Sequence, residues 1–284
     1  MSAKDKSAAS PAPPSPAVAL AAGFAPVRAQ PITFWRLNVA LFGSFIRAVV
    51  APWHPASRPL ARAAFEQLFV LGYVTLLLTL VVCTLLCGAG ASFALGTPYA
   101  MLYRTFLPEI LGRVFISQVA PLVAAFLVIS RSIVAMTAEL ASMRVSQEID
   151  ALEVLGVDPV GFLLLPRALA LFVAMPATVL FAIYAALVGG WLATRMRLGS
   201  SLPVFTEAFF RGSDAMLLCI ALGETLLAAW WVLTVGGYFG LNARTDRREG
   251  VGRAVRFAVV YCVLGVALLH FIATMLGQRV TAGG

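Results

Sequence analysis

Two long apolar runs are separated by the polar stretch SMRVSQEIDALEVLGVDPV (residues 142–160), which carries four acids and one arginine. Both neighbouring runs are long enough to cross a bilayer core of roughly 30 Å. The whole chain of 284 residues is 61% hydrophobic and 12% charged, with a mean hydropathy of +0.91. A soluble domain needs more charge on its surface, so the sequence predicts an integral membrane protein.

Apolar runs of membrane-spanning length recur five times along the chain. We predict an all-α integral membrane fold with five transmembrane helices, at residues 65–86, 114–140, 162–193, 215–239 and 254–276. A further short helix outside the membrane is predicted over residues 99–113.

The N-terminal region differs in composition from the rest. Residues 1–30 are rich in Ala, Pro and Ser, which predicts a disordered cytoplasmic tail. Residues 31–63 predict an interfacial amphipathic helix and linker, with Trp35 and Trp53 near the ends of its apolar part. Residues 64–284 form the predicted transmembrane domain.

The distribution of basic residues predicts the orientation. Fourteen lysines and arginines fall in segments that a cytoplasmic N-terminus places inside, six fall outside, and Arg131 lies within a span. This asymmetry favours a cytoplasmic N-terminus, and it explains the net charge of +8 without a nucleic-acid partner. The stretch 142–160 is therefore expected in the cytoplasm.

Cysteine and histidine give no sign of a metal site or a catalytic centre. The four cysteines lie in apolar spans, which favours packing roles, and His54 and His270 are far apart in the chain. We expect no catalytic residue and no metal ligand.

The polar stretch itself predicts a short helix. Ser146 is a suitable N-terminal cap and Gly156 a suitable C-terminal stop, near residues 145–156. Val145, Ile149 and Leu152 recur at helical spacing and make an apolar stripe. Asp158 and Pro159 then predict the cap and first residue of the next helix.

This stretch also resembles a family signature. The segment MTAELASMRVSQEIDALEVLGVDPV, followed by LLLPRALA (residues 136–170), resembles the MlaE family, the permeases of MCE-linked ABC lipid transporters. The resemblance extends upstream to APLVAAFLVISR and downstream to GGYFGLNA and EGVGRAVRFAVV. It implies a helix that docks into an ATPase subunit, with coupling residues Glu148, Ile149, Asp150, Ala151, Leu152, Gly156, Val157, Asp158 and Pro159.

The resemblance implies partners as well. They are an ABC ATPase that binds ATP and Mg²⁺, a periplasmic MCE-domain protein, a lipid substrate and a second copy of this chain, in the bacterial inner membrane. No Gly-x-x-x-x-Gly-Lys-Ser/Thr motif occurs here, so the nucleotide site belongs to the partner.

Polar groups within spans are candidates for the substrate cavity, since they are costly in lipid. Arg131 and Glu139 are eight residues apart and predicted on one side of span 2, where a pairing within the protein is favoured over substrate contact. Glu224 and His270 lie on spans 4 and 5, where a contact between them would reduce the cost of both. His270 is favoured as a packing residue, while Glu224 suits a cavity-lining or a structural role.

The sequence departs from the family at the outer end of span 2. Relatives commonly read Arg-Glu-Leu-x-Pro where this chain reads SQVAP, so that Gln118 and Pro121 stand in an uncharged segment. His270 also replaces a common Asp, which predicts a divergent paralogue with a changed membrane cavity.

Three alternatives stay open. An ion-coupled secondary transporter would use Glu224, His270 or Glu139 as a proton site. A membrane-embedded lipid enzyme lacks a metal-spaced cluster, and a non-transporting scaffold subunit would fit the altered cavity.

Overall fold

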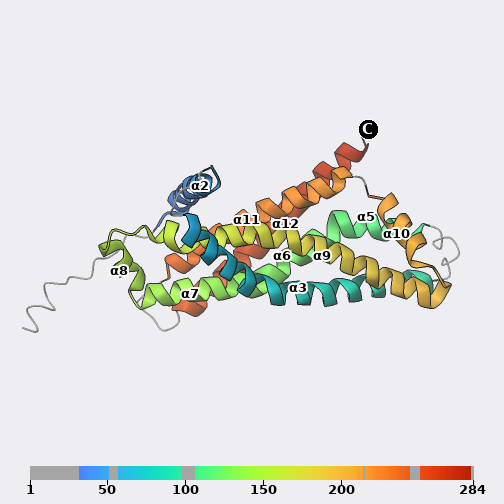
Figure 1. Cartoon of the computed structure of the whole chain (residues 1–284), viewed down its shortest axis with the longest axis horizontal. Coiled ribbons are helices and arrows are strands. Elements are labelled where there is room, and N and C mark those ends of the chain that lie inside the picture. The colour runs from blue at the N-terminus through green and yellow to red at the C-terminus, as the bar shows by residue number, and fades with distance from the viewer. Residues whose placement is uncertain (1–31, 51–56, 98–105, 214, 244–249, 283–284) are drawn as a thin grey trace, which may run out of the picture. The chain divides into compact units, whose positions relative to one another are not determined.

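Long helices make up nearly all of the chain that the computed structural model describes, namely residues 32–50, 57–97, 106–213, 215–243 and 250–282 (Figure 1). The tail predicted over residues 1–30 lies outside these ranges. The α-helices are α2 (Phe34–Val50), α3 (Ser57–Gly96), α5 (Leu107–Val114), α6 (Ala120–Val128), α7 (Val134–Val145), α8 (Glu148–Val154), α9 (Leu165–Leu198), α10 (Leu202–Arg211), α11 (Ala215–Leu241) and α12 (Gly250–Ala282).

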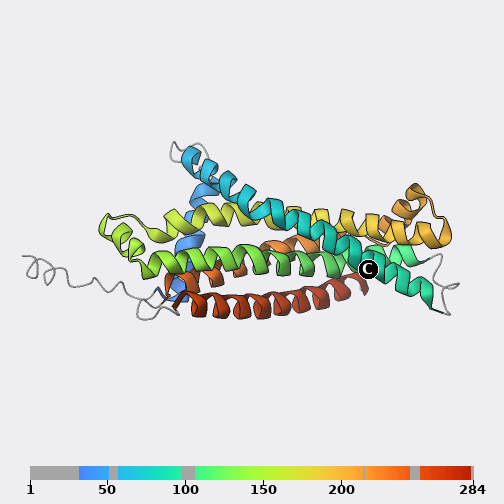
Figure 2. The same cartoon turned by 90° about the horizontal axis from the view of Figure 1, so that it is seen from below.

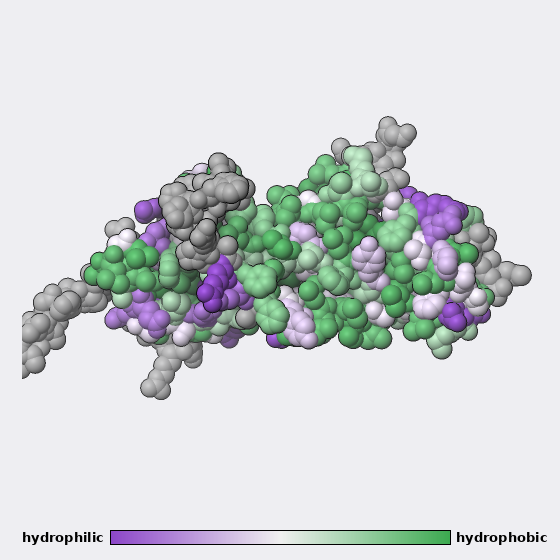
Figure 3. All heavy atoms as spheres, viewed as in Figure 1, coloured by the Kyte–Doolittle hydropathy of each residue, from purple (hydrophilic) through white to green (hydrophobic). Residues whose placement is uncertain are grey.

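Five helical runs are long and apolar enough to cross a membrane. They are Arg62–Gly96, Leu107–Val145, Val160–Leu198, Ala215–Leu241 and Gly250–Gly277. On the face shown in Figure 3, apolar residues cover the middle of these runs and hydrophilic residues gather toward the two ends. The predicted all-α membrane fold with five spans is therefore confirmed.

Two predicted boundaries are wrong. The first span does not end near Leu86, because the Gly- and Ala-rich residues that follow continue α3 to Gly96. The second long run begins at Leu107, so α5 is continuous with it rather than a separate helix. Residues 99–105 of that prediction lie outside the described ranges.

Three π-helical turns interrupt the second and third spans. They are η1 (Phe115–Val119), η2 (Ile129–Ile133) and η3 (Val160–Leu164). A π-helical turn inserts an extra residue and often marks a functional position. Hydropathy alone gives no signal for such a turn.

Small residues bring α3 and α9 into direct backbone contact. A Cβ atom on Gly189 would collide with the carbonyl oxygen of Thr84, and the Thr84 hydroxyl donates a hydrogen bond to the Ala185 carbonyl at 3.1 Å. Cys83 and Cys87 are fully buried beside this contact, as a packing role predicts. Of the four cysteines, Cys219 differs because it is exposed.

Helix α2 crosses the long helices near the end of the bundle where α8 lies, which we call the α8 end (Figures 1 and 2). Its Leu37 and Leu41 are fully buried in the core, while Trp35 and Phe42 are exposed. The Asn242 side chain at the end of α11 fixes the start of α2, because it accepts from the Ile32 amide and donates to the Ile32 carbonyl, both at 2.8 Å. An apolar exposed side fits a helix at a lipid boundary.

Candidate functional site

Helix α8 joins the second span to the third, beyond the ends of both (Figure 1). It ends at Val154 with Leu155 as C-cap, and the next residue, Gly156, has a φ of 75° in the left-handed region. The Gly156 amide donates to the Glu153 carbonyl and the Val157 amide to the Leu152 carbonyl, both at 3.0 Å. This pair of bonds is a Schellman motif, so the predicted stop at Gly156 is confirmed.

The predicted cap at Ser146 is wrong. Gln147 occupies the N-cap position with a left-handed φ of 63°, and its side chain makes no cap hydrogen bond. The Ser146 hydroxyl instead donates to the Ser142 carbonyl at 3.0 Å and lies 2.8 Å from Glu148 Oε1. Ser146 is the C-cap of α7, so its hydroxyl makes the usual bond to the carbonyl four residues earlier in that helix.

The predicted start of the next helix at Asp158 is confirmed. Its carboxylate oxygens accept hydrogen bonds from the amides of Val160 at 3.2 Å and Gly161 at 3.1 Å. Pro159 follows as the first helical residue, where its missing N–H costs nothing. The end of the polar stretch is thereby fixed to the start of η3.

The inner face of α8 holds it to the bundle. Ile149 is 0% exposed and packs into the main core. Arg144 Nη1 lies 2.6 Å from Asp150 Oδ1, and both side chains are largely shielded from solvent. Leu152 is half-buried. Ile149 and Asp150 are therefore turned toward their own chain.

The outer face of α8 carries apolar and acidic side chains together. Val154 and Leu155 are 73% and 76% exposed, and the acids Glu148 and Glu153 are exposed beside them. Sequence reasoning missed Val154 and Leu155 because they lie off the apolar stripe. Their signal was a large apolar pair directly before the glycine stop.

Glu139 and Arg131 are exposed on the same side of the second span, as predicted, but they do not pair with each other. Glu139 Oε2 lies 2.8 Å from Arg167 Nη2 on α9. Arg167 is 4% exposed, and its Nη1 has no hydrogen-bond partner among the described residues. This ion pair connects α7 to the first turn of α9, a role that the sequence did not assign to Arg167.

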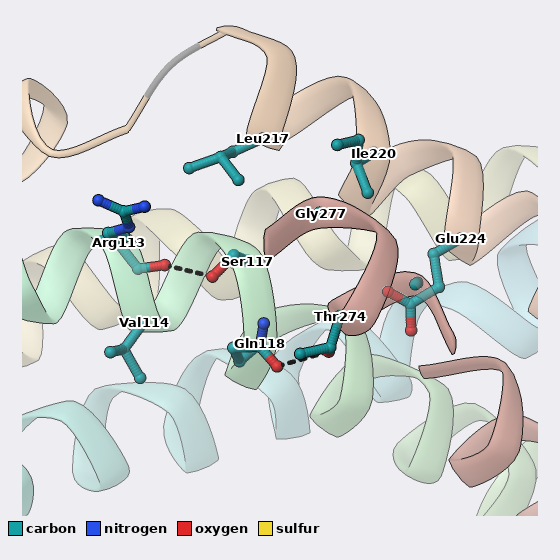
Figure 4. A pocket seen from close by; sticks show the side chains of 10 residues that line it. Arg113, Val114, Ser117, Gln118, Leu217, Ile220, Glu224, Thr274 and Gly277 are labelled. Atoms are coloured by element: carbon teal, nitrogen blue, oxygen red, sulfur yellow. Dashed lines mark hydrogen bonds between the residues drawn. The ribbon is translucent and has the colours of Figure 1, made fainter. Parts of the chain in front are cut away.

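A cavity of about 290 Å³ lies at the opposite end of the bundle, which we call the α10 end (Figure 4). Thr274 on α12 donates to Gln118 Oε1 at 2.8 Å, and the Ser117 hydroxyl donates to the Arg113 carbonyl at 2.7 Å. Its lining comes from α5, η1, α11 and α12 and comprises Arg113, Val114, Ser117, Gln118, Leu217, Ile220, Glu224, Ala273, Thr274 and Gly277.

The contact predicted between Glu224 and His270 is present. His270 Nδ1 lies 2.7 Å from Glu224 Oε1, and the Glu224 residue is 7% exposed. The pair joins α11 to α12 at the wall of the cavity. Pro121 is buried in the first turn of α6 and does not line the cavity.

The structure therefore separates the predicted residues into three places. Gln118 and Glu224 line the cavity, with His270 paired to Glu224; Glu139 lies in the ion pair with Arg167, and Arg131 lies between these sites. In the described part of the chain, no group of three or more His, Cys, Asp or Glu residues is arranged to hold a metal ion.

Five apolar spans, a short acidic helix between the second and third of them, and a cavity between the second, fourth and fifth define the class: a multi-pass α-helical membrane protein with the features of a permease. A model of the family Permease MlaE matches residues 64–276. This chain belongs to the MlaE permease family.

Individual relatives agree with this assignment. The chain is 27% identical to the intermembrane phospholipid transport system permease protein MlaE of Haemophilus influenzae, over 84% of this chain and 89% of that protein. It is 26% identical to a probable ABC transporter permease protein of Rickettsia prowazekii, over 57% of this chain, and the match spans 62% of that relative. The chloroplastic protein TRIGALACTOSYLDIACYLGLYCEROL 1 of Arabidopsis thaliana is 27% identical over 57% of this chain and 46% of its own length.

Proposed function

We propose that this chain is the membrane subunit of an ATP-driven transporter of glycerophospholipid or a similar amphiphile. A separate ABC ATPase would bind ATP and Mg²⁺, and a periplasmic MCE-domain protein would exchange lipid with the inner membrane through this subunit. The observation that carries the proposal is α8, a short helix held firmly to the bundle on one face and exposed on the other. The name of the Haemophilus relative supports lipid as the substrate class.

The exposed face of α8 suits a partner groove. Val154 and Leu155 offer an apolar centre, and Glu148 and Glu153 offer negative charge around it. Interfaces commonly combine such a centre with a charged rim, where the rim charges direct association. The groove would accordingly have an apolar floor and basic edges.

Force applied to α8 would reach two spans at once. Toward the second span, it passes through buried Ile149 and the ion pair between Asp150 and Arg144. Toward the third span, it passes through the capped turn at Asp158. In this proposal Ile149 and Asp150 are positioning residues, and Val154 and Leu155 touch the ATPase.

The lipid would lie between two copies of the chain. Helices α3 and α12 expose large apolar side chains along their lengths, among them Leu77, Val81, Leu264 and Leu268. Such faces suit acyl chains or a second copy of the same helices. The cavity at the α10 end would then face the side from which the MCE-domain protein takes or delivers lipid.

The test is co-purification of the ATPase from native membranes with wild-type protein and a Leu155→Glu variant. We expect the variant to lose at least nine-tenths of the bound ATPase, roughly the effect of 1.4 kcal/mol or more in binding. Val204→Glu is the matched control, because Val204 is also exposed but lies on α10 at the far end. Equal ATPase recovery with wild type and Leu155→Glu would overturn the docking role of α8.

Ion-coupled transport is the second candidate, since the pair of Glu224 and His270 beside a cavity is a chemically reasonable proton site. In reconstituted vesicles, transport that continues without ATP and stops when the proton gradient is collapsed would favour it. Transport that requires ATP and continues after the proton gradient is collapsed would exclude ion coupling.

A further inference from the structure

The second span carries a cation on its exposed side. Arg131 lies in the π-helical turn η2, with Ser130 exposed before it and Ala135 exposed one turn later. The neighbouring residues Ile129, Ser132 and Ile133 are buried in the bundle. The extra residue of the π-helical turn therefore coincides with the position where a charged side chain is turned outward.

The depth of Arg131 follows from two contacts between the second span and α12. Gln118 accepts the hydrogen bond from Thr274, and Ala141 packs in one cluster with Ala254. Residues 254 and 274 are about 30 Å apart along a helix that rises 1.5 Å per residue. That length equals the usual thickness of the hydrocarbon layer.

Arg131 lies between these two levels. It is about 20 Å along the helix from Gln118 and about 15 Å from Ala141. An arginine side chain is shorter than either distance, so it does not reach a headgroup layer by extending along the protein surface. Arg131 is thus an exposed charge well inside the second candidate span, between these two contact levels.

Within the described residues, none of the ion pairs includes Arg131. The carboxylate two turns along the same face, Glu139, is engaged by Arg167 at 2.8 Å. Helices α12, α11 and α3 pack beside η2, and α12 and α3 carry many exposed apolar side chains, such as Leu264 and Leu77. In Figure 2 the green α7 and the red α12 run side by side.

A guanidinium group in such surroundings requires an anion or water, because lipid tails offer it no partner. A phosphate oxygen pair matches the planar fork of arginine, and apolar walls match acyl chains. We propose that Arg131 binds the phosphate group of the transported lipid midway across the membrane. The inference rests on the proposed lipid transport and adds a transit site distinct from the cavity at the α10 end.

The full-length protein, purified in its complex, tests this by native mass spectrometry with added phosphatidic acid or diacylglycerol carrying the same acyl chains. The two lipids differ only in the phosphate. We expect wild type to retain phosphatidic acid in preference to diacylglycerol, and Arg131→Gln to lower phosphatidic acid retention at least tenfold. Arg131→Lys should keep most of the retention, which also shows that the altered position still folds. Arg197→Gln, at an exposed arginine near the end of α9, should retain as much lipid as wild type.

Several results would overturn the inference. Equal retention of phosphatidic acid by wild type and Arg131→Gln would overturn the role of Arg131 but leave the proposed lipid transport standing. If wild type retained no phospholipid at all, the proposed function itself would be wrong. Displacement of phosphatidic acid by excess inorganic phosphate would identify a free anion as the ligand. A change in the number of copies in Arg131→Gln, with unchanged lipid retention per copy, would show that a second copy covers Arg131.

Discussion

Arg144 Nη1 and Asp150 Oδ1 lie 2.6 Å apart, so the last turn of α7 is bonded to the first turn of α8. In Asp150→Asn this charge-assisted bond is weakened, which should lower the free energy of unfolding by about 1 kcal/mol. We also expect less co-purified ATPase, because α8 is held less firmly. Exchange of the two charges, with Arg144→Asp and Asp150→Arg, should restore most of that ATPase. If the exchanged protein folds and still binds no ATPase, Asp150 contacts the partner directly.

Gly156 should tolerate no other residue without cost. Its φ of 75° is unfavourable for alanine by about 1–2 kcal/mol, although a Cβ there would meet nothing within 4 Å. Gly156→Ala should therefore speed amide hydrogen exchange in α8 and leave the rest of the bundle unchanged. Gly223→Ala is the control, since Gly223 also has open space around it but lies within α11. Equal exchange in both variants would contradict the cap.

The contact between α3 and α9 should be sensitive to added volume. Gly189→Ala places a methyl group against the Thr84 carbonyl and should destabilise the protein by about 1–3 kcal/mol or more. A thermal unfolding midpoint measured in detergent will show this. Gly90→Ala on α3 meets nothing within 4 Å and should leave the midpoint unchanged or raise it. A Gly189→Ala variant as stable as Gly90→Ala would mean that the two helices separate easily.

Single substitutions of Glu224 and of His270 should lower the free energy of unfolding by different amounts. His270→Leu leaves Glu224 buried without its hydrogen bond and should cost about 1–3 kcal/mol. Glu224→Gln keeps a neutral hydrogen-bonding group and should cost less. A double variant with leucine at both positions should recover part of the loss, because no uncompensated acid remains. Thermal unfolding of all four proteins decides this, and a double variant less stable than His270→Leu would contradict it.

The sequence correctly predicted the features that depend only on residues close together in the chain. The glycine stop at Gly156 and the cap at Asp158 follow from backbone conformation and short-range hydrogen bonds. The five spans follow from hydropathy, which depends on composition over about twenty residues. These features need no knowledge of tertiary packing.

The features that the sequence did not predict depend on contacts between helices that are far apart in the chain. Beyond Leu86, α3 continues alongside α9, where a Cβ on Gly88 would lie 3.2 Å from the Gly189 carbonyl oxygen. The partner of Glu139 proved to be Arg167, because the turn of η3 and α9 brings the arginine against α7. The exposed pair of Val154 and Leu155 also depends on which face of α8 the bundle covers, and helical periodicity alone does not determine that face.

The backbone contact at Gly189 has a mechanical consequence. Because α3 and α9 touch without intervening side chains, they have little freedom to slide or separate and should move as one stiff body. Helix α12 is the least buried of the five candidate spans along its most apolar stretch. We therefore expect a change in the volume of the cavity at the α10 end to involve movement of α12 relative to the α3 and α9 pair.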